Sequence, residues 1–435
     1  MIPAAIRRRA FGLARGLAAG PALAVLLVDA AVVGVRTSRR RRAGSRPRLV
    51  YGPTPIISIK YMSEAMRRRG YETLTLVYGI AAINQRSDYD VTFAELLGSG
   101  GGRVRVNARE LLGPYLAFHG ALTRGDVFHF FFDGGFLRFT PLRFLELQLL
   151  HLAGKRVVVM PYGGDVALPS RTRSAAFREA FMAEYPEVAA REAETARWIS
   201  YFSRHADFTV GCLVHVETMP RCDLLATHYY PIDVEEWSHG EVHGGRDEVV
   251  VFHSSNHRAV KGTRFVVEAC DELAAEGVRI RLDLAEGVPN VEVRSRLASA
   301  DVLAEQFVLG YALSAMEGMS LGKPVLSNLE DDAYYGVFRE RTGLDECPLV
   351  STTPDMLKPA LHRLATDPAL RAELGAAGRA YVLKFHSFEP VGRMWELVYR
   401  TVWHGEPLER TAWHPGREPA TAGPADIGTG QAVAQ

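Results

Sequence analysis

The sequence predicts an α/β protein with two domains, each built on a parallel sheet. The chain has 435 residues, and single hydrophobic cores usually stop growing beyond roughly 250–300 residues. Apolar runs of strand length alternate with helical patterns of about 10–15 residues, which is typical of βαβ units. The alternation stops at a charged, glycine-rich stretch, 233–247, and then begins again. We therefore expect one domain at 48–240 and a second at 247–380.

The first half contains these elements in order. The run 126–134 is apolar throughout, as in a parallel strand that is buried on both faces. The segment 227–233, THYYPID, completes this half. Strands are expected at 48–52, 72–79, 126–134, 155–160 and 206–213, and helices at 55–70 and 141–154.

The second half repeats the pattern and ends in helices. We expect a C-terminal helix at 381–403, returning to the first domain. The tail, 404–435, is rich in Gly, Pro, Ala and Thr and is predicted to be disordered. Strands are expected at 248–255, 278–287, 301–308 and 324–328, and helices at 262–277, 290–300 and 311–321.

The first 47 residues combine arginines with an apolar run, 20–35. This run is shorter than the roughly 20 apolar residues of a spanning helix and contains Asp29. We expect 1–47 to be an extension, with peripheral membrane contact through residues 1–45, because arginines near anionic lipid add about 1 kcal/mol each. The alternatives are a secretory signal, which lacks a convincing cleavage site here, and a disordered or misannotated extension.

Composition excludes some classes of function. Lys and Arg number 51 against 50 Asp and Glu, which gives no support to nucleic-acid binding. The four cysteines have no C-x-x-C spacing and no regular disulfide framework. We therefore expect buried thiols in a reducing compartment. No D-x-D follows a strand, and no His or Cys set has ligand spacing. We therefore expect no metal and no cofactor.

The segment 310–328, GYALSAMEGMSLGKPVLSN, places one carboxylate, Glu317, among small and apolar residues. Gly310 permits a tight turn into a helix whose first amides lack intrahelical partners and attract anions. Glu317 lies about one and a half turns further on and suits ribose hydroxyls. The alternative is an exposed glutamate on an ordinary amphipathic helix.

A basic loop, 253–263, HSSNHRAVKGT, directly follows the strand at 248–255. His257, Arg258 and Lys261 lie beyond the strand's C-terminal end, where ligands bind in open α/β sheets. Lys261 would neutralise a phosphate as a point charge, and Arg258 would bind it bidentately. The alternative is a solvated basic loop.

Together these residues resemble the donor domain of retaining glycosyltransferases of the GT-B fold, in the group 1 or family 4-like class. The matching segments are HRAVKGT, DVLAEQ and 310–328, with looser matches before the linker, over roughly residues 48–403. The resemblance implies two Rossmann-like domains that face a cleft. It also implies transfer of a sugar, as by a hexosyltransferase, from a nucleotide-sugar donor to a hydroxyl of a glycan or lipid-linked acceptor, with retention.

The resemblance implies roles for individual residues. Lys261 and Arg258 would hold the donor diphosphate, and Glu317 the donor ribose. Amides of the turn after Gly310 would meet the phosphates or the sugar. The other donor-binding positions are Gly310, Tyr311, Ala312, Leu313 and Gln306, the catalytic positions are Tyr162, Gly164 and Asp165, and the acceptor-side positions are Thr54 and Lys60.

The sequence departs from the family pattern at two positions. Leu309 stands where the first of two glutamates is expected, and Gln306 and Glu305 nearby are the candidates to substitute for it. Tyr162 replaces a histidine of the loop before Asp165. The alternative function is therefore a non-catalytic GT-B protein that binds a nucleotide or glycan. For the enzyme we expect a cytoplasmic location, peripheral at the inner face of the cell membrane, in polysaccharide or cell-envelope synthesis.

Overall fold

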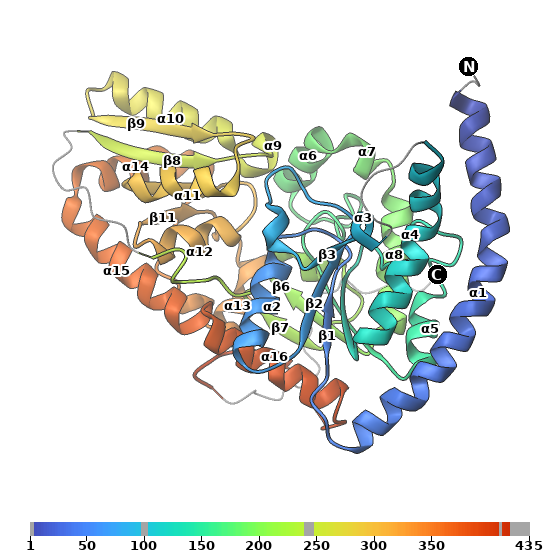
Figure 1. Cartoon of the computed structure of the whole chain (residues 1–435). Helices are drawn as coiled ribbons and strands as arrows, with labels where there is room; N and C mark the ends of the chain where they lie inside the picture. The colour runs from blue at the N-terminus through green and yellow to red at the C-terminus, as the bar shows by residue number, and fades with distance from the viewer. Residues whose placement is uncertain (1–3, 97–102, 239–247, 409–410, 418–435) are drawn as a thin grey trace, which may run out of the picture.

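The computed structural model describes residues 4–96, 103–238, 248–408 and 411–417. Two α/β units lie side by side, each with helices packed around a parallel sheet (Figure 1). Apart from β13, the strands of the first sheet come from residues before the expected linker, and those of the second sheet come from residues after it. Residues 239–247 of that linker lie outside the described residues.

The N-terminal sheet has eight strands in the order β13-β7-β6-β5-β4-β1-β2-β3. The central strand β4 is buried along its whole length, which explains its unbroken apolar sequence. Its strands are β1 (Leu49–Tyr51), β2 (Thr73–Val77), β3 (Val91–Thr92), β4 (Val127–Phe131), β5 (Arg156–Met160), β6 (Phe208–Cys212), β7 (Leu224–Ala226) and β13 (Thr411–Ala412). The segment 227–233 is a loop after β7.

The C-terminal sheet has five strands in the order β12-β11-β10-β8-β9, and its paired strands are parallel. Its central strand β10 therefore ends beside β8 and β11, at the edge where ligands bind in such sheets. Its strands are β8 (Val249–Ser254), β9 (Ile280–Ala285), β10 (Val302–Gln306), β11 (Val325–Ser327) and β12 (Val350–Ser351).

Helices cover both sheets. Those of the N-terminal half are α1 (Ala4–Arg42), α2 (Ser58–Arg68), α3 (Phe93–Leu96), α4 (Arg103–Arg124), α5 (Glu146–Leu152), α6 (Ala175–Glu184), α7 (Pro186–Ala189) and α8 (Glu192–His205). Those of the C-terminal half are α9 (Arg258–Lys261), α10 (Thr263–Ala275), α11 (Asn290–Ser299), α12 (Leu313–Ser320), α13 (Asp332–Thr342), α14 (Leu357–Thr366), α15 (Pro368–Phe385) and α16 (Phe388–Val402). Single 3-10 turns lie at 86–88, 213–218, 344–346 and 354–356.

The C-terminal chain returns to the N-terminal unit, as the sequence predicts. Helix α16 packs on α2, and its Trp395 and Tyr399 join the core around Tyr51. The expected disorder from residue 404 onward is wrong for part of the tail, because β13 pairs with β7 and extends the sheet. Backbone pairing, which composition does not reveal, orders this stretch. Residues 409–410 and 418–435 lie outside the described residues.

Helix α1 lies along the outer side of the N-terminal unit (Figure 1). It packs on α4 and α5, and Leu26, Ala30 and Val33 are buried in this contact. Asp29 is not an isolated charge, since it pairs with His119 of α4 at 2.7 Å. By length and composition, Ala14–Arg42 is long and apolar enough to cross a membrane. The apolar run 20–35 alone therefore underestimated the length of this helical segment.

Candidate functional site

Six of the predicted site residues line a cavity between the two units. This cavity has a volume of about 220 Å³, and its walls come from the C-terminal ends of strands in both sheets. The N-terminal unit contributes residues after β1, β5, β6 and β7, and the C-terminal unit contributes Gln306 and 309–313. Of the predicted residues, Tyr162, Gln306, Gly310, Tyr311, Ala312 and Leu313 line it.

Glu317 is a buried carboxylate without a hydrogen bond from the described residues. It lies in α12, 5% exposed, among residues that are nearly all buried. Burial raises its pKa to about 8, and Glu236 and Glu305 add to this effect, whereas Lys261 and Arg294 oppose it. A buried polar group without a partner is costly, and a ligand that donates hydrogen bonds to this carboxyl would offset that cost.

Lys261 and Glu305 form the charged centre of the donor side. Lys261 Nζ lies 3.7 Å from Glu305 Oε1 and 3.3 Å from Ser314 Oγ, which itself donates to Glu305 Oε1 at 2.6 Å. Burial raises the pKa of Glu305, which Lys261 and the serine hydroxyls oppose. From the sequence, Glu305 was considered only as a substitute for the glutamate that is absent at Leu309. Its position at the C-terminal end of β10 is the signal that could have found it.

The turn into α12 brings backbone amides to the cavity wall. A Cβ at Gly310 would collide with the ring of Tyr335, so this close approach requires glycine. The Ala312 side chain cannot cap α12, and no side-chain cap bond is present there. The start of α12 therefore directs the positive end of its dipole toward an anion, and the Ala312 amide already donates to the Glu305 carboxyl there.

Asp165 holds the loop after β5 through that loop's own backbone. Its Oδ1 accepts hydrogen bonds from the amides of Tyr162 at 2.9 Å and Gly163 at 2.8 Å, and Oδ2 accepts from Phe132 at 3.0 Å. Gly163 has φ +140°, a conformation that favours glycine. Burial raises the Asp165 pKa to about 7, which Asp133 reinforces and the amides oppose. Asp165 is thus placed to position the loop, and its catalytic role stays a prediction.

Asp133 is a site residue that the sequence analysis missed. It directly follows β4 and accepts hydrogen bonds from Thr54 Oγ1 at 2.9 Å and Tyr162 Oη at 3.4 Å. Arg138 pairs with it. Burial raises its pKa, and Arg138 and Thr54 oppose the rise. This cluster joins the loops after β1, β4 and β5, so the strand-end position of Asp133 was the signal available in the sequence.

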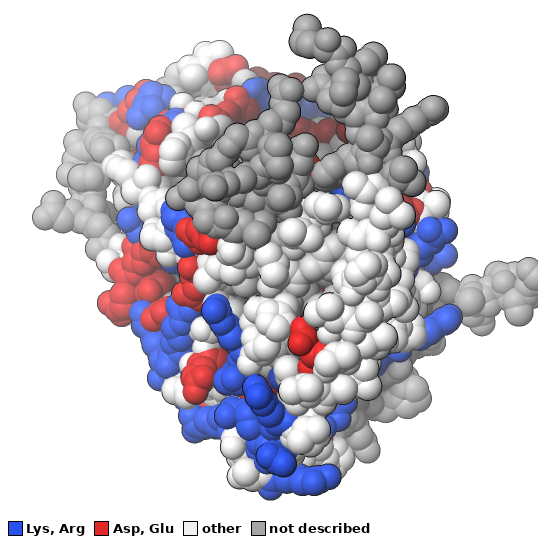
Figure 2. All heavy atoms as spheres, turned by 45° about the vertical axis from the view of Figure 1, so that its right-hand side comes forward, with Lys and Arg blue, Asp and Glu red and all other residues white. Residues whose placement is uncertain are grey.

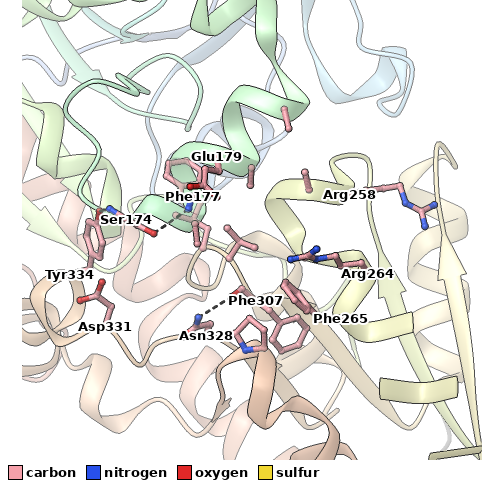
Figure 3. A pocket seen from close by; sticks show the side chains of 18 of the residues that line it. Ser174, Phe177, Glu179, Arg258, Arg264, Phe265, Phe307, Asn328, Asp331 and Tyr334 are labelled. Carbon is pink, nitrogen blue, oxygen red and sulfur yellow. Dashed lines mark hydrogen bonds between the residues drawn. The ribbon is translucent and has the colours of Figure 1, made fainter. Parts of the chain in front are cut away.

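Two predicted residues lie apart from Glu317 and Lys261. The Arg258 guanidinium pairs with Glu286 at 2.9 Å and points away from the cavity beside α6 (Figure 3). Lys60 pairs with Asp88 at 3.1 Å and Glu236 at 3.6 Å. Gly164 lies in the loop of Asp165 with no atom within 4 Å of its ideal Cβ.

Within the described residues, no group of three or more His, Cys, Asp or Glu could hold a metal ion.

A second cavity of about 600 Å³ opens between α6 and the C-terminal unit (Figure 3). Leu309 lines both cavities, so they share a wall. The amide of Ser174 donates to Tyr334 Oη at 2.7 Å across the two units. The apolar part of its wall includes Phe177, Phe265 and Phe307.

Comparisons with known proteins find likeness in structure and none in sequence. No protein family and no curated protein matches the chain. The structure resembles HepE of Anabaena in complex with UDP, at 12% identity and a TM-score of 0.54, over 81% of this chain and 100% of that one. It resembles HepE in complex with UDP-glucose at 12% identity and 0.52, over 82% and 100%. The predicted fold class, two Rossmann-like domains facing a cleft in the GT-B fold, is confirmed.

Proposed function

We propose that the protein transfers a sugar, with retention, from a nucleoside-diphosphate sugar to a hydroxyl group of a glycan or lipid-linked acceptor. The observation that carries this proposal is Glu317, a buried carboxylate that accepts no hydrogen bond within the described residues, beside Lys261 and the start of α12. Support also comes from the shared fold with HepE, which was solved with UDP and with UDP-glucose.

In this proposal the groups of the donor bind to separate partners. The two Glu317 oxygens are free to accept from the ribose hydroxyls. Lys261 and the amides at the start of α12 would hold the diphosphate, on which negative charge grows as the sugar departs. Binding of that anion would compete with Glu305 for Lys261, because the two already lie 3.7 Å apart. No protein-bound metal is needed in this arrangement, and none is proposed.

The N-terminal loops would present the acceptor. Asp165 fixes the loop of Tyr162, whose ring lines the smaller cavity and whose hydroxyl reaches Asp133. The larger cavity beside Leu309 would take the rest of the acceptor. Its phenylalanines suit an apolar portion, and Arg264 points into it and supplies positive charge for an anionic group (Figure 3). These features favour a lipid-linked acceptor of the kind used in cell-envelope synthesis.

A binding screen of the full chain tests the donor site. UDP, GDP, ADP and their glucose conjugates are compared by thermal shift, since a ligand at 100 times its Kd stabilises by about 2.7 kcal/mol. Glu317→Ala is expected to lower affinity for the effective nucleotide by about two- to tenfold, because the buried carboxyl has its pKa raised to about 8 and a neutral hydrogen bond contributes about 0.5–1.5 kcal/mol. Glu292→Ala, an exposed glutamate of α11, is the matched control.

The outcomes separate the two functions. Absence of a shift with every nucleotide would contradict the proposal. Nucleotide binding without turnover in the presence of lipid-linked acceptors would favour the non-catalytic alternative, for which Leu309 is the relevant observation. Turnover with product of the donor's anomeric configuration, read by NMR, would establish retention.

We further propose a cytoplasmic protein that rests on the inner face of the cell membrane through α1. Figure 2 shows a broad, mostly uncharged expanse on this side of the molecule, interrupted by acidic atoms, with Lys and Arg gathered below it. The arginines 39–42 form the last turn of α1, so an apolar face adjoins a basic end, which suits anionic lipid. The exposed apolar side chains of α1 and α4 are Leu17, Val25, Leu27, Val28, Val32, Val35, Leu112 and Leu116.

Vesicle flotation tests this orientation. Val28 and Val32 are 65% and 51% exposed, so Val28→Asp with Val32→Asp is expected to abolish flotation with phosphatidylglycerol-containing vesicles and leave the fold intact. Val291→Asp is the control, because Val291 is 50% exposed but belongs to α11. Equal flotation of both variants would contradict the proposed surface.

A further inference from the structure

Two polar side chains at the smaller cavity make no hydrogen bond of good geometry within the part of the chain that the structure describes, although His228 lies near the Tyr311 backbone and Ser58 lies near Tyr229. Among the described residues, no hydrogen-bond partner in good geometry is found for either ring nitrogen of His228 or for Ser58 Oγ. Both side chains are buried, at 6% exposure for His228 and 3% for Ser58. Other described side chains also bury an unpaired polar atom, but of that set only Ser58 and His228 line this cavity.

The surroundings of His228 explain why its nitrogens stay unpaired. Its ring packs against the ring of Tyr311 with centroids 4.8 Å apart, and against that of Tyr230 at 5.0 Å. The Tyr311 hydroxyl is already engaged with His386 Nε2 at 3.1 Å. Burial, with His386 and His215 nearby, lowers the His228 pKa well below its ordinary value, and the Tyr311 backbone opposes this only partly. His228 is therefore a neutral imidazole with one donor and one acceptor to offer.

The cavity has the size and position of a sugar ring and not of a whole nucleotide sugar. Its volume of about 220 Å³ is below the range of about 300–1,000 Å³ for complete small-molecule sites. One wall is the start of α12, where the diphosphate is placed above, so the group bonded to that diphosphate enters the cavity. The remaining walls are largely apolar, with Ile56, Leu213 and Leu309 among them.

We propose that His228 and Ser58 bind hydroxyl groups of the sugar that is transferred. This inference rests on the proposed function and names the residues that read the sugar. A sugar hydroxyl both donates and accepts, so it satisfies an imidazole and a serine hydroxyl that the protein leaves unpaired. The two residues come from different segments, the start of α2 and the loop after β7, and therefore contact different parts of the ring.

The test compares UDP with UDP-glucose, or the equivalent pair for the base that binds. For His228→Leu, which replaces the imidazole with an apolar side chain of similar size, we expect unchanged UDP affinity. Its affinity for the nucleotide sugar is expected to fall by about two- to tenfold, the loss from a neutral hydrogen bond. His228→Gln, which retains a donor and an acceptor, is expected to restore part of this affinity. Ser58→Ala is expected to act in the same direction as His228→Leu.

His129→Leu is the matched control for folding. His129 is also buried, but its nitrogens are paired with Val50 O at 3.1 Å and Tyr399 Oη at 3.0 Å. We expect His129→Leu to lower the melting temperature of the unliganded protein and His228→Leu to leave it unchanged or raise it. A lower melting temperature in His228→Leu, or full sugar-dependent affinity in that variant, would overturn the inference.

The result also separates this inference from the donor proposal. If the wild type binds no nucleotide and no nucleotide sugar, the proposed function fails and the inference fails with it. If the wild type binds the nucleotide sugar more tightly than the nucleotide, and His228→Leu and Ser58→Ala both keep that difference, only the inference fails.

Discussion

Asp165 of the N-terminal unit and Glu317 of the C-terminal unit are both buried acidic side chains near the cleft. Asp165 accepts hydrogen bonds from the amides of Tyr162, Gly163 and Phe132. Glu317 accepts none from the described residues. The raised pKa has burial as its main cause in both, at about 7 for Asp165 and about 8 for Glu317.

The difference shows that burial and a shifted pKa do not by themselves identify a ligand-binding residue. Asp165 has partners within its own loop, so its carboxylate contributes to folding and holds Tyr162 in place. Glu317 lacks such partners, so its cost is offset only when a ligand arrives. Variants of the two residues should therefore separate stability from binding.

The largest effect is expected for Asp165→Ala. It leaves the buried amide of Phe132 and the part-buried amides of Tyr162 and Gly163 without an acceptor. Because a buried unsatisfied group costs about 1–3 kcal/mol, the free energy of unfolding should fall by about 2 kcal/mol or more. Urea unfolding followed by circular dichroism measures it. Asp165→Asn, which keeps one carbonyl oxygen, should lose less free energy of unfolding. An Asp165→Ala variant as stable as the wild type would contradict the structural role of Asp165.

Glu317→Gln should change how stability depends on pH. Between the ordinary glutamate pKa of about 4.3 and about 8, the folded wild type holds a proton that the unfolded chain releases. Wild-type stability therefore decreases as pH rises from 5 to 8, by up to about 1.4 kcal/mol per pH unit relative to Glu317→Gln. The charged groups that act on this carboxyl are Lys261 of α9, Glu305 of β10, Arg294 of α11 and Glu236.

Unfolding of both proteins at pH 5, 6.5 and 8 gives that difference. Other buried carboxyls, such as Glu146 with its pKa raised by burial to about 8, are common to both proteins and cancel. A difference that does not vary with pH would mean that Glu317 is charged and compensated in the folded state, contrary to its surroundings.

Arg258→Ala is expected to have the smallest effect on stability. Its pair with Glu286 joins a side chain that is 58% exposed to one that is 38% exposed, and exposed pairs contribute about 0–1 kcal/mol. Nucleotide titration decides its other role. A loss of affinity comparable to that of Lys261→Ala would show that Arg258 turns toward the diphosphate when donor binds, as the sequence predicts.

The alternation of strands and helices was predictable because parallel strands buried on both faces carry unbroken apolar runs, as β4 and β5 do. The very short strands β3, β12 and β13 were missed, since two residues hold no pattern and only pairing defines them. Helix α1 was read as a short apolar run because its arginine-rich end does not look like the continuation of an apolar helix.

The candidate site was predictable to the level of segments. Glu317 and Lys261 were found because a lone charge among apolar residues and a basic strand-end loop are visible in sequence. Asp133, Ser58 and His228 were missed because what distinguishes them is which hydrogen bonds they make or lack in three dimensions.

The return of α16 and β13 to the N-terminal sheet makes the C-terminal unit an insertion within the N-terminal one. The core around Tyr51 needs Trp395 and Tyr399, and the sheet needs Thr411 to close its edge beside β7. The ribosome synthesises residues 248–385 before it synthesises α16 and β13. We infer that the inserted unit, contiguous in sequence, completes its fold first, and the unit synthesised earlier finishes last.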